Sequence, residues 1–347
     1  MTLACILGCS GPTLTPDERD FFRDVRPWGF ILFRRNVETP EQVRALVDAL
    51  VETTGRTDVP VLIDQEGGRV QRLRPPHWPK YPPGRAYGQV SANDPLVQRE
   101  LTRLGARLIA HDLRQLGINV DCLPVLDVPV PGAHDIIGDR AYAEDPYTVS
   151  VLGRAAAEGL MAGGVLPVVK HIPGHGRAFA DSHEALPTVD TALEELDAWD
   201  FQPFKALSDM PAAMTAHVVY TAIDKKKPAT TSKKAVRLIR EELGFGGLLM
   251  SDDLSMNALS GGLGERARDA LKAGCDVVLH CNGVMAEMQQ VVSHTGKLKG
   301  DAKRRAEAAM ARIVRAPEPF DPAEARARFD EAFAGIDAAA GPKVGEA

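Results

Sequence analysis

Long hydrophobic runs, tracts of one charge and paired cysteines are all missing from this 347-residue sequence, and each absence argues against a class of protein. No apolar stretch approaches the ~20 residues needed to cross a bilayer, so we expect no membrane-spanning segment. The net charge of −6 comes from 41 basic and 47 acidic residues dispersed along the chain. Without a basic tract, neither nucleic acid nor a membrane surface is an expected partner.

The five cysteines are an odd number without CxxC spacing, and they lie in or beside apolar runs: Cys5, Cys9, Cys122, Cys275 and Cys281. This pattern is typical of reduced, buried thiols in a cytoplasmic protein rather than of disulfides or zinc ligands. The phosphate-binding patterns GxxxxGK[ST] and GxGxxG are absent as well. We therefore expect no metal, no cofactor and no nucleotide.

What the sequence does contain is a regular alternation of short apolar runs with longer amphipathic stretches. This alternation is typical of buried parallel strands joined by helices. We interpret the apolar N-terminal run as the first strand rather than as a signal, because no basic region precedes it. The expected strands are residues 3–9, 29–33, 59–63, 118–125, 166–169, 212–216, 248–250 and 276–279.

Eight such strand–helix units without a long linker predict an α/β fold, a single (β/α)8 TIM-like barrel, with an open doubly wound sheet as the alternative. We assign residues 1–300 to the barrel and 301–347 to closing helices and a C-terminal tail that form no separate domain. Capping boxes are expected at Thr15 and Thr39, each followed by proline. Gly164, Gly244 and Gly274 are expected to end helices in a left-handed conformation.

Seven of the apolar runs end on a polar side chain. A barrel carries its active site at the C-terminal ends of its strands, so these side chains should meet at one mouth. They are Arg34, Asp64, Asp127, Lys170 with His171, His217, Asp252 and His280.

The segment from Lys170 to His183 is the richest in potential catalytic groups. Asp181 and His183 are two residues apart, so the carboxylate can accept a hydrogen bond from one imidazole nitrogen and leave the other for proton transfer. Their loop is long enough to fold over the mouth of a barrel. The spacing therefore predicts a general acid/base.

Two further stretches carry candidate residues. Asp252 directly follows an apolar strand and should point into the mouth as a nucleophile, a base or a metal ligand, whereas Asp253 is expected to begin a helix as its N-cap. In the Asp64-Gln-Glu-Gly-Gly-Arg-Val-Gln-Arg72 segment, the two glycines predict a tight turn and Arg72 supplies forked donors. Arg140 follows the Asp127 strand and could also reach the mouth.

At these residues the sequence resembles glycoside hydrolase family 3, in particular its compact single-domain bacterial β-N-acetylglucosaminidases. The resemblance extends in order from about residue 29 to 282. The resembling motifs are Leu-Ile-Asp-Gln-Glu-Gly-Gly-Arg-Val-Gln-Arg, Pro-Val-Leu-Asp-Val, Ile-Gly-Asp-Arg-Ala-Tyr, Lys-His-Ile-Pro-Gly-His-Gly with Asp-Ser-His, Thr-Ala-His-Val-Val-Tyr and Met-Ser-Asp-Asp-Leu-Ser-Met.

The resemblance implies a cytoplasmic exo-enzyme that removes terminal β-linked N-acetylglucosamine from 1,6-anhydro-muropeptides during cell-wall recycling. It implies retention through a covalent glycosyl-enzyme, with Asp252 as nucleophile and His183 as acid/base paired with Asp181. It assigns sugar binding to Asp64, Arg72, Arg140, Lys170 and His171. We expect a monomer whose partner is a small glycan or muropeptide. The loop between Asp127 and Arg140 looks slightly longer than is usual in the family.

Other functions remain open at this point. A metal-dependent amidohydrolase is suggested by Lys170, His217 and Asp252, although the His-x-His pair expected after an early strand is replaced by Asp64-Gln-Glu66. A Schiff-base aldolase would use Lys170. A sugar-binding barrel without activity would lose Asp252 or His183, and both are present. A phosphorylase would use the same residues, with phosphate in place of water.

Overall fold

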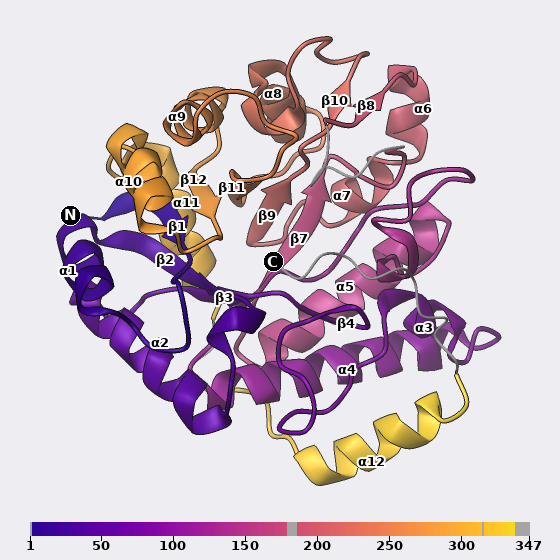
Figure 1. Ribbon diagram of the computed structural model, residues 1–347. Coiled ribbons are helices and arrows are strands. Elements are labelled where there is room, and N and C mark those ends of the chain that lie inside the picture. The colour runs from indigo at the N-terminus through magenta and orange to yellow at the C-terminus, as the bar shows by residue number, and fades with distance from the viewer. Residues whose placement is uncertain (1, 179–185, 314–315, 337–347) are drawn as a thin grey trace.

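The barrel predicted from the sequence is confirmed. The computed structural model describes residues 2–178, 186–313 and 316–336, and within them eight parallel strands close into a barrel (Figure 1). In pairing order they are β1 (Leu3–Leu7), β2 (Pro27–Leu32), β3 (Val61–Ile63), β6 (Val120–Asp121), β7 (Leu166–Ile172), β9 (Ala212–Thr215), β11 (Leu248–Asp253) and β12 (Val277–His280), which pairs with β1.

Two apolar layers hold the barrel together, because successive side chains of a strand point to opposite faces. In β1, Ala4 and Ile6 belong to a cluster with residues from all eight barrel strands, which fills the interior. Cys5 and Leu7 belong to a second cluster that also contains helical residues such as Val43. Each strand therefore packs on both faces, as its nearly continuous apolar sequence predicts.

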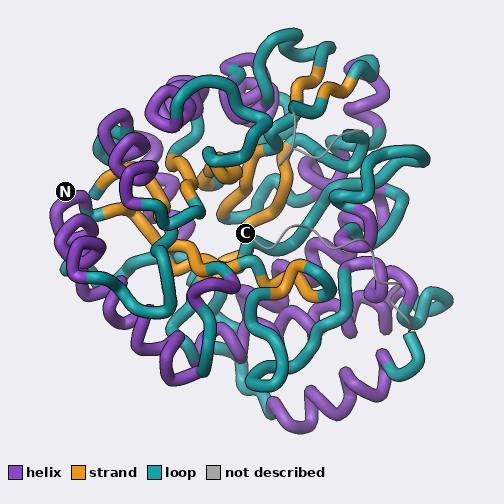
Figure 2. The backbone as a smooth tube through the Cα atoms, in the orientation of Figure 1, coloured by secondary structure: helices purple, strands orange, loops and turns teal. Residues whose placement is uncertain are grey.

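Helices surround the strands (Figure 2). Two of them begin at the predicted N-cap residues, Thr15 and Thr39, and the capping box is complete only at Thr15. The Thr15 hydroxyl accepts a hydrogen bond from the Glu18 N–H, and the Glu18 carboxylate accepts one from the Thr15 N–H. At Thr39 only half of the box forms, because the Gln42 side chain accepts from the Glu38 N–H instead. The helices up to the end of the barrel are α1 (Pro16–Val25), α2 (Pro40–Thr54), α3 (Gly84–Gln89), α4 (Pro95–Gln115), α5 (Pro146–Ala162), α6 (Leu193–Ala198), α7 (Gln202–Ala206), α8 (Lys233–Glu241), α9 (Leu263–Ala273) and α10 (Met285–His294).

Short elements at the strand ends add to the barrel. A hairpin, β4 (Gln65–Gly67) with β5 (Val70–Gln71), follows β3, and β8 (Thr188–Val189) pairs with β10 (Val219–Tyr220). Short 3-10 turns follow β2, β6 and β10 in the described residues, namely Arg34–Asn36, Gly138–Arg140 and Ala229–Thr231. The glycines expected to end helices, Gly164, Gly244 and Gly274, all have positive φ.

Within the residues that the structure describes, two helices follow the barrel. In α11 (Gly300–Met310), Ala306 and Ala309 are buried against the interior cluster. Helix α12 (Pro322–Phe333) lies along α4, as Figure 1 shows, and buries Phe329 there. Both helices thus use apolar side chains to pack on the barrel.

Burial also keeps the cysteine thiols protonated. All five are free thiols in buried positions, as predicted. Burial raises the pKa of Cys5 and Cys275 to about 12, so both remain protonated at neutral pH. In the part of the chain that the structure describes, no helix is both long and apolar enough to cross a membrane.

Candidate active site

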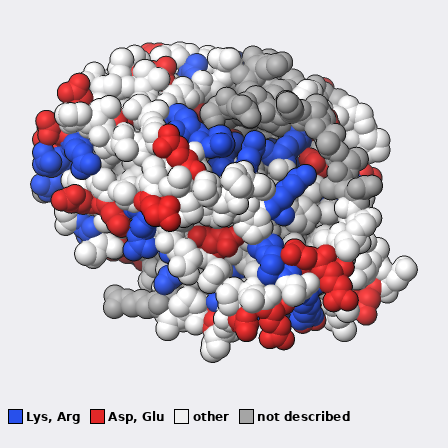
Figure 3. Space-filling model, turned by 60° about the horizontal axis from the view of Figure 1, so that its bottom comes forward, with Lys and Arg blue, Asp and Glu red and all other residues white. Residues whose placement is uncertain are grey.

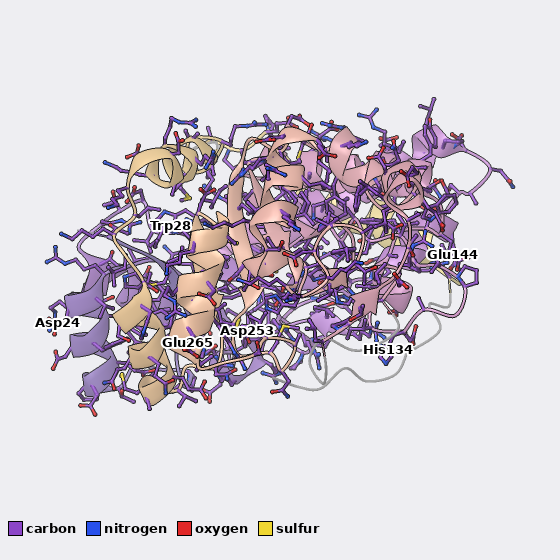
Figure 4. The ribbon with its side chains drawn as sticks, turned by 90° about the horizontal axis from the view of Figure 1, so that it is seen from above. Asp24, Trp28, His134, Glu144, Asp253 and Glu265 are labelled. Atoms are coloured by element: carbon purple, nitrogen blue, oxygen red, sulfur yellow. The ribbon has the colours of Figure 1, made fainter. Side chains whose placement is uncertain are left out.

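A cavity opens where the C-terminal ends of the barrel strands meet. Six of the eight predicted site residues line it: Asp64, Arg72, Arg140, Lys170, His171 and Asp252. The other two, Asp181 and His183, lie outside the described residues. In Figure 4, Asp253 and His134 mark this side of the molecule, whereas Trp28, near the start of β2, lies toward the opposite side.

Two carboxylates and three cations form a chain of ion pairs across the cavity. The Lys170 ammonium lies 2.8 Å from Asp64 Oδ1 and 2.6 Å from Glu66 Oε1. Arg140 donates two hydrogen bonds of 2.8 Å to Glu66, and Arg72 donates one of 3.2 Å to Asp64. These ion pairs therefore join β7, the β3–β4 segment and the turn after β6.

These ion pairs keep the two carboxylates and the lysine of the cavity in their charged forms. Burial alone would raise the pKa of Glu66, but Arg140 and Lys170 lower it to about 2. In the same way, Lys170 and Arg72 overcome burial and hold the pKa of Asp64 below its usual range. Burial would lower the pKa of Lys170, yet Asp64 and Glu66 raise it above its usual value. A lysine held in its charged form is unsuited to Schiff-base chemistry, which needs the free amine.

Asp127 is the next group along the mouth. It is fully buried, and its carboxylate accepts hydrogen bonds from the His171 ring (2.7 Å), the His171 N–H (3.2 Å) and the His175 N–H (2.6 Å). Burial would raise its pKa, but the two histidines lower it to about 2. The ionised carboxylate thus requires a proton on His171 Nδ1, which leaves Nε2 for the cavity.

The position of Arg72 depends on the β4–β5 hairpin. The Gln65 side-chain oxygen accepts hydrogen bonds of 3.0 Å from the backbone N–H groups of Arg72 and Leu73. Gly67 and Gly68 form the turn with φ of 97° and 57°, and a side chain on Gly67 would clash with the Pro82 carbonyl. The Arg72 guanidinium then lies 4.7 Å from the centre of the Phe33 ring.

A second arginine of this hairpin holds the turn that carries Arg140. Arg69 Nη2 donates to the carbonyl oxygens of Asp135, Ile136 and Ile137 at 2.6, 2.9 and 3.2 Å, and its Nε lies 3.0 Å from the Asp139 carboxylate. Ile136 and Ile137 line the cavity. The segment between Asp127 and Arg140 is therefore tied to the β4–β5 hairpin.

The two acids at the end of β11 have different roles. Asp252 is half-buried at the cavity, and its Oδ1 accepts a hydrogen bond of 2.8 Å from the Asp253 N–H. The expectation that Asp253 is a helix N-cap is wrong, because the next helix begins at Leu263. Instead its carboxylate accepts from the N–H groups of Ser255 (3.1 Å) and Cys281 (3.2 Å), which ties β11 to the segment after β12.

The sequence placed Asp127 at the mouth without giving it a role, and it did not assign Glu66 to the site. Glu66 holds two of the predicted sugar-binding cations, and Asp127 orients His171. Asp127 directly follows an apolar strand, the same signal that selected Asp64, whereas Glu66 lies further along, after Asp64 and Gln65, and carries no such signal. His217 also follows an apolar run, and its ring, like the Lys170 ammonium, is bonded to protein oxygen atoms.

Charges of both signs occur around this region. Figure 3 shows basic side chains gathered in the upper middle of one face and acidic side chains along its lower edge. Neither sign covers the face, in agreement with the dispersed charge of the sequence. Among the described residues, no group of three or more His, Cys, Asp or Glu is arranged to hold a metal ion.

The barrel and its cavity of paired acids and cations have the form of an enzyme active site, and comparison with known proteins gives the family. A model described as the glycosyl hydrolase family 3 N-terminal domain matches residues 17–316, so the chain belongs to this family. A protein of Methylococcus capsulatus named beta-hexosaminidase is 41% identical over 276 residues, which cover 78% of this chain and 80% of that protein.

Solved structures agree with this membership. The structure titled NagZ from Neisseria gonorrhoeae in complex with zinc ion has a TM-score of 0.82 and 31% identity, and the match covers 96% of each chain. A family 3 β-N-acetylglucosaminidase from Paenibacillus has a TM-score of 0.82 and 33% identity, covering 95% of this chain and 67% of that one. The family resemblance found in the motifs is thereby confirmed.

Proposed function

We propose that this protein is a retaining exo-β-N-acetylglucosaminidase that removes terminal N-acetylglucosamine from peptidoglycan fragments in the cytoplasm. The observation that carries the proposal is the convergence of Asp252 with the charged sugar-binding residues in one cavity of a family 3 glycoside hydrolase. The relatives named beta-hexosaminidase support N-acetylhexosamine as the sugar.

The reaction proceeds in two displacements. Asp252 attacks the anomeric carbon, and His183, paired with Asp181, protonates the departing glycosidic oxygen. The same imidazole then removes a proton from water, which attacks the anomeric carbon and releases Asp252. An imidazole titrating near ~6.5 can serve as acid and then as base near neutral pH, so a histidine can perform the role usually given to a carboxylic acid.

The ion-pair chain binds and orients the sugar. Arg72, Arg140 and Lys170 donate to ring hydroxyls, while Asp64 accepts from them, and each keeps its own charged partner when the cavity is empty. Because these partners already fix the side chains, little conformational entropy is lost on binding. The sugar is therefore held with its anomeric carbon before Asp252.

The decisive experiment compares two nitrophenyl glycosides on the wild-type enzyme and on Asp252→Asn. We expect rapid turnover of the β-N-acetylglucosaminide, much slower turnover of the β-glucoside, and loss of both activities in the variant, because an amide cannot form the glycosyl ester. Tight binding of N-acetylglucosamine to the variant would show that its site is intact. Near-wild-type activity of Asp252→Asn would refute the nucleophile assignment, and equal turnover of both glycosides would refute the sugar assignment.

A further inference from the structure

His217 is a fully buried imidazole that the mechanism above does not use. It lies just after β9, with Nδ1 2.7 Å from the Thr230 hydroxyl and Nε2 2.9 Å from the backbone carbonyl oxygen of Asp253. The Thr230 hydroxyl is itself 2.8 Å from the Thr215 hydroxyl. Both ring nitrogens therefore have partners inside the protein.

The partners dictate where the imidazole proton lies. Burial lowers the pKa of His217, so the ring is neutral at neutral pH and carries one proton. A carbonyl oxygen can only accept, which places this proton on Nε2. Nδ1 is then the acceptor, and the Thr230 hydroxyl lies nearer to it (2.7 Å) than to its other acceptor, the Ala216 carbonyl oxygen (3.1 Å). The threonine hydroxyl thus favours the tautomer in which His217 donates to Asp253.

The residue whose carbonyl accepts this bond, Asp253, also contacts the nucleophile through its own N–H, which lies in the preceding peptide unit. That N–H donates to Asp252 Oδ1 at 2.8 Å, and the Asp253 carboxylate is bonded to the N–H groups of Ser255 and Cys281. The Leu254 N–H, which shares a peptide unit with the Asp253 carbonyl, donates to the Leu279 carbonyl at 2.9 Å. The strand register shifts between Met250 and Asp253, and pairing with β12 resumes at Asp253, opposite Leu279. The bond from His217 therefore adds a side-chain constraint at the residue where pairing resumes.

We infer that His217 is a positioning residue, which sets the direction of the Asp252 carboxylate through the Asp253 backbone. This inference rests on the proposed function, since it requires Asp252 to be the nucleophile. Loss of the bond removes one constraint on the Asp253 backbone, and a shift of that residue moves the N–H that holds Asp252 Oδ1 and with it the attacking oxygen. Because a displacement near 1 Å costs on the order of 100-fold in rate, one hydrogen bond outside the cavity has a large kinetic effect.

The test compares His217→Leu with His217→Gln, because the glutamine amide nitrogen can take the place of Nε2 and donate to the Asp253 carbonyl. For His217→Leu we expect kcat/KM for nitrophenyl N-acetylglucosaminide to fall roughly 10- to 100-fold, while the inhibition constant of N-acetylglucosamine changes less than about twofold. His217→Gln should recover most of the loss. Unchanged kcat/KM in His217→Leu, or no recovery in His217→Gln, would overturn the inference.

A second pair of variants covers the case in which His217→Leu fails to fold. Thr230→Val keeps the shape of the side chain but removes the hydroxyl that favours this tautomer, and Thr230→Ser keeps the hydroxyl. We expect Thr230→Val to lower kcat/KM about 3- to 10-fold with unchanged N-acetylglucosamine inhibition, and Thr230→Ser to behave like wild type. Equal activity of the two Thr230 variants would count against the inference.

The Asp252→Asn variant distinguishes a failure of the nucleophile assignment from a failure of the positioning role of His217. If Asp252→Asn is inactive and the His217 and Thr230 variants are as active as wild type, only the positioning role is wrong. If Asp252→Asn keeps near-wild-type activity, both the nucleophile assignment and the positioning role are wrong.

Discussion

Among single residues, Glu66 joins two cations of the cavity, because its carboxylate binds both Lys170 and Arg140. The side chain of Lys170 is only 2% exposed, so its charge depends on nearby anions rather than on water. Asp64 supplies one of these anions and Glu66 the other. Glu66 thus contributes to stability, and it holds two of the residues proposed to bind the sugar.

We therefore predict that Glu66→Gln is destabilising by about 3–5 kcal/mol, because it leaves buried cations with too little negative charge. The matched control is Glu144→Gln, since the exposed Glu144 pairs with Arg85 at the surface and should contribute at most about 1 kcal/mol. Denaturant unfolding of both variants measures the difference. Equal stability of the two variants would mean that the buried chain of ion pairs adapts to the loss of one charge.

The effect of replacing His183 should depend on the acidity of the leaving group. A nitrophenolate departs with little protonation, whereas a sugar alkoxide needs nearly a full proton, so His183→Ala should slow a disaccharide substrate by ~10²–10⁴-fold and spare the first step on nitrophenyl substrates. The glycosyl-enzyme should then accumulate, because its hydrolysis still needs the base. Mass spectrometry of the protein during turnover detects this species.

Asp181→Asn should act in the same direction but less strongly, because the imidazole remains and loses only its orienting anion. Equal losses for all leaving groups in His183→Ala would instead assign His183 to binding. In that case Glu184 would become the better candidate for the acid.

The sequence predicted those site residues that directly end strands, and it did so for a topological reason. In a closed parallel barrel every strand end opens at the same mouth, so chain order alone brings Asp64, Lys170 and Asp252 together. It could not identify Glu66, whose role depends on a contact with Arg140 that is distant in sequence. It also assigned Asp253 to a helix, because hydrogen bonds to Ser255 and Cys281 leave no sequence pattern.

At the scale of elements, the β4–β5 hairpin acts as the support for the turn that carries Arg140. Arg69 binds three successive carbonyl oxygens and the Asp139 carboxylate of that turn. Removing these bonds loosens Ile136, Ile137 and Arg140 together. The effect should therefore appear in substrate binding more than in the chemistry at Asp252.

We predict that Arg69→Gln raises KM for an N-acetylglucosaminide about tenfold, with a smaller change in kcat. Arg85→Gln is the control, because Arg85 binds the exposed Glu144 and lies outside the described cavity lining. Steady-state kinetics of both variants provide the comparison. A fall in kcat without a change in KM would show that the hairpin supports the reacting groups themselves.

Strand positions followed from the sequence, while strand ends did not. The predicted strand 118–125 contains only the two residues of β6 in regular pairing, because Pro124 has no N–H to donate. Backbone bonds from Val168 and Lys170 still reach the Leu123 and Pro124 carbonyls. Conversely, β7 and β11 extend through polar residues, where the apolar pattern stops but pairing continues.

For the molecule as a whole, buried histidines make stability depend on pH. Burial, and next the neighbouring His171, lower the pKa of His175 to about 4, whereas the unfolded chain has a value near ~6.5. Between these values the unfolded state binds the proton and the native state does not. This histidine therefore contributes a loss of stability as the pH falls from about 6.5 to about 4, of up to about 3 kcal/mol.

We predict that His175→Gln reduces the pH dependence of unfolding between pH 6.5 and 4, measured by denaturant titration at several pH values. His77→Gln serves as the control, since His77 is exposed and should leave the dependence unchanged. Identical pH profiles for wild type and His175→Gln would mean that the imidazole takes up its proton in the native state.

The pairing of β1 with β12 has a consequence for the ribosome-bound chain. Cys5 lies opposite Val278, so the first strand to be synthesised waits for the last strand of the barrel. Until then β1 and the most recently made strand are open sheet edges, the kind of surface that invites pairing with other chains. Such long-range closure is slow compared with local helix formation. A nascent or truncated chain ending before Val277 is thus a nearly complete barrel with two unprotected edges, and it is a natural client for chaperones.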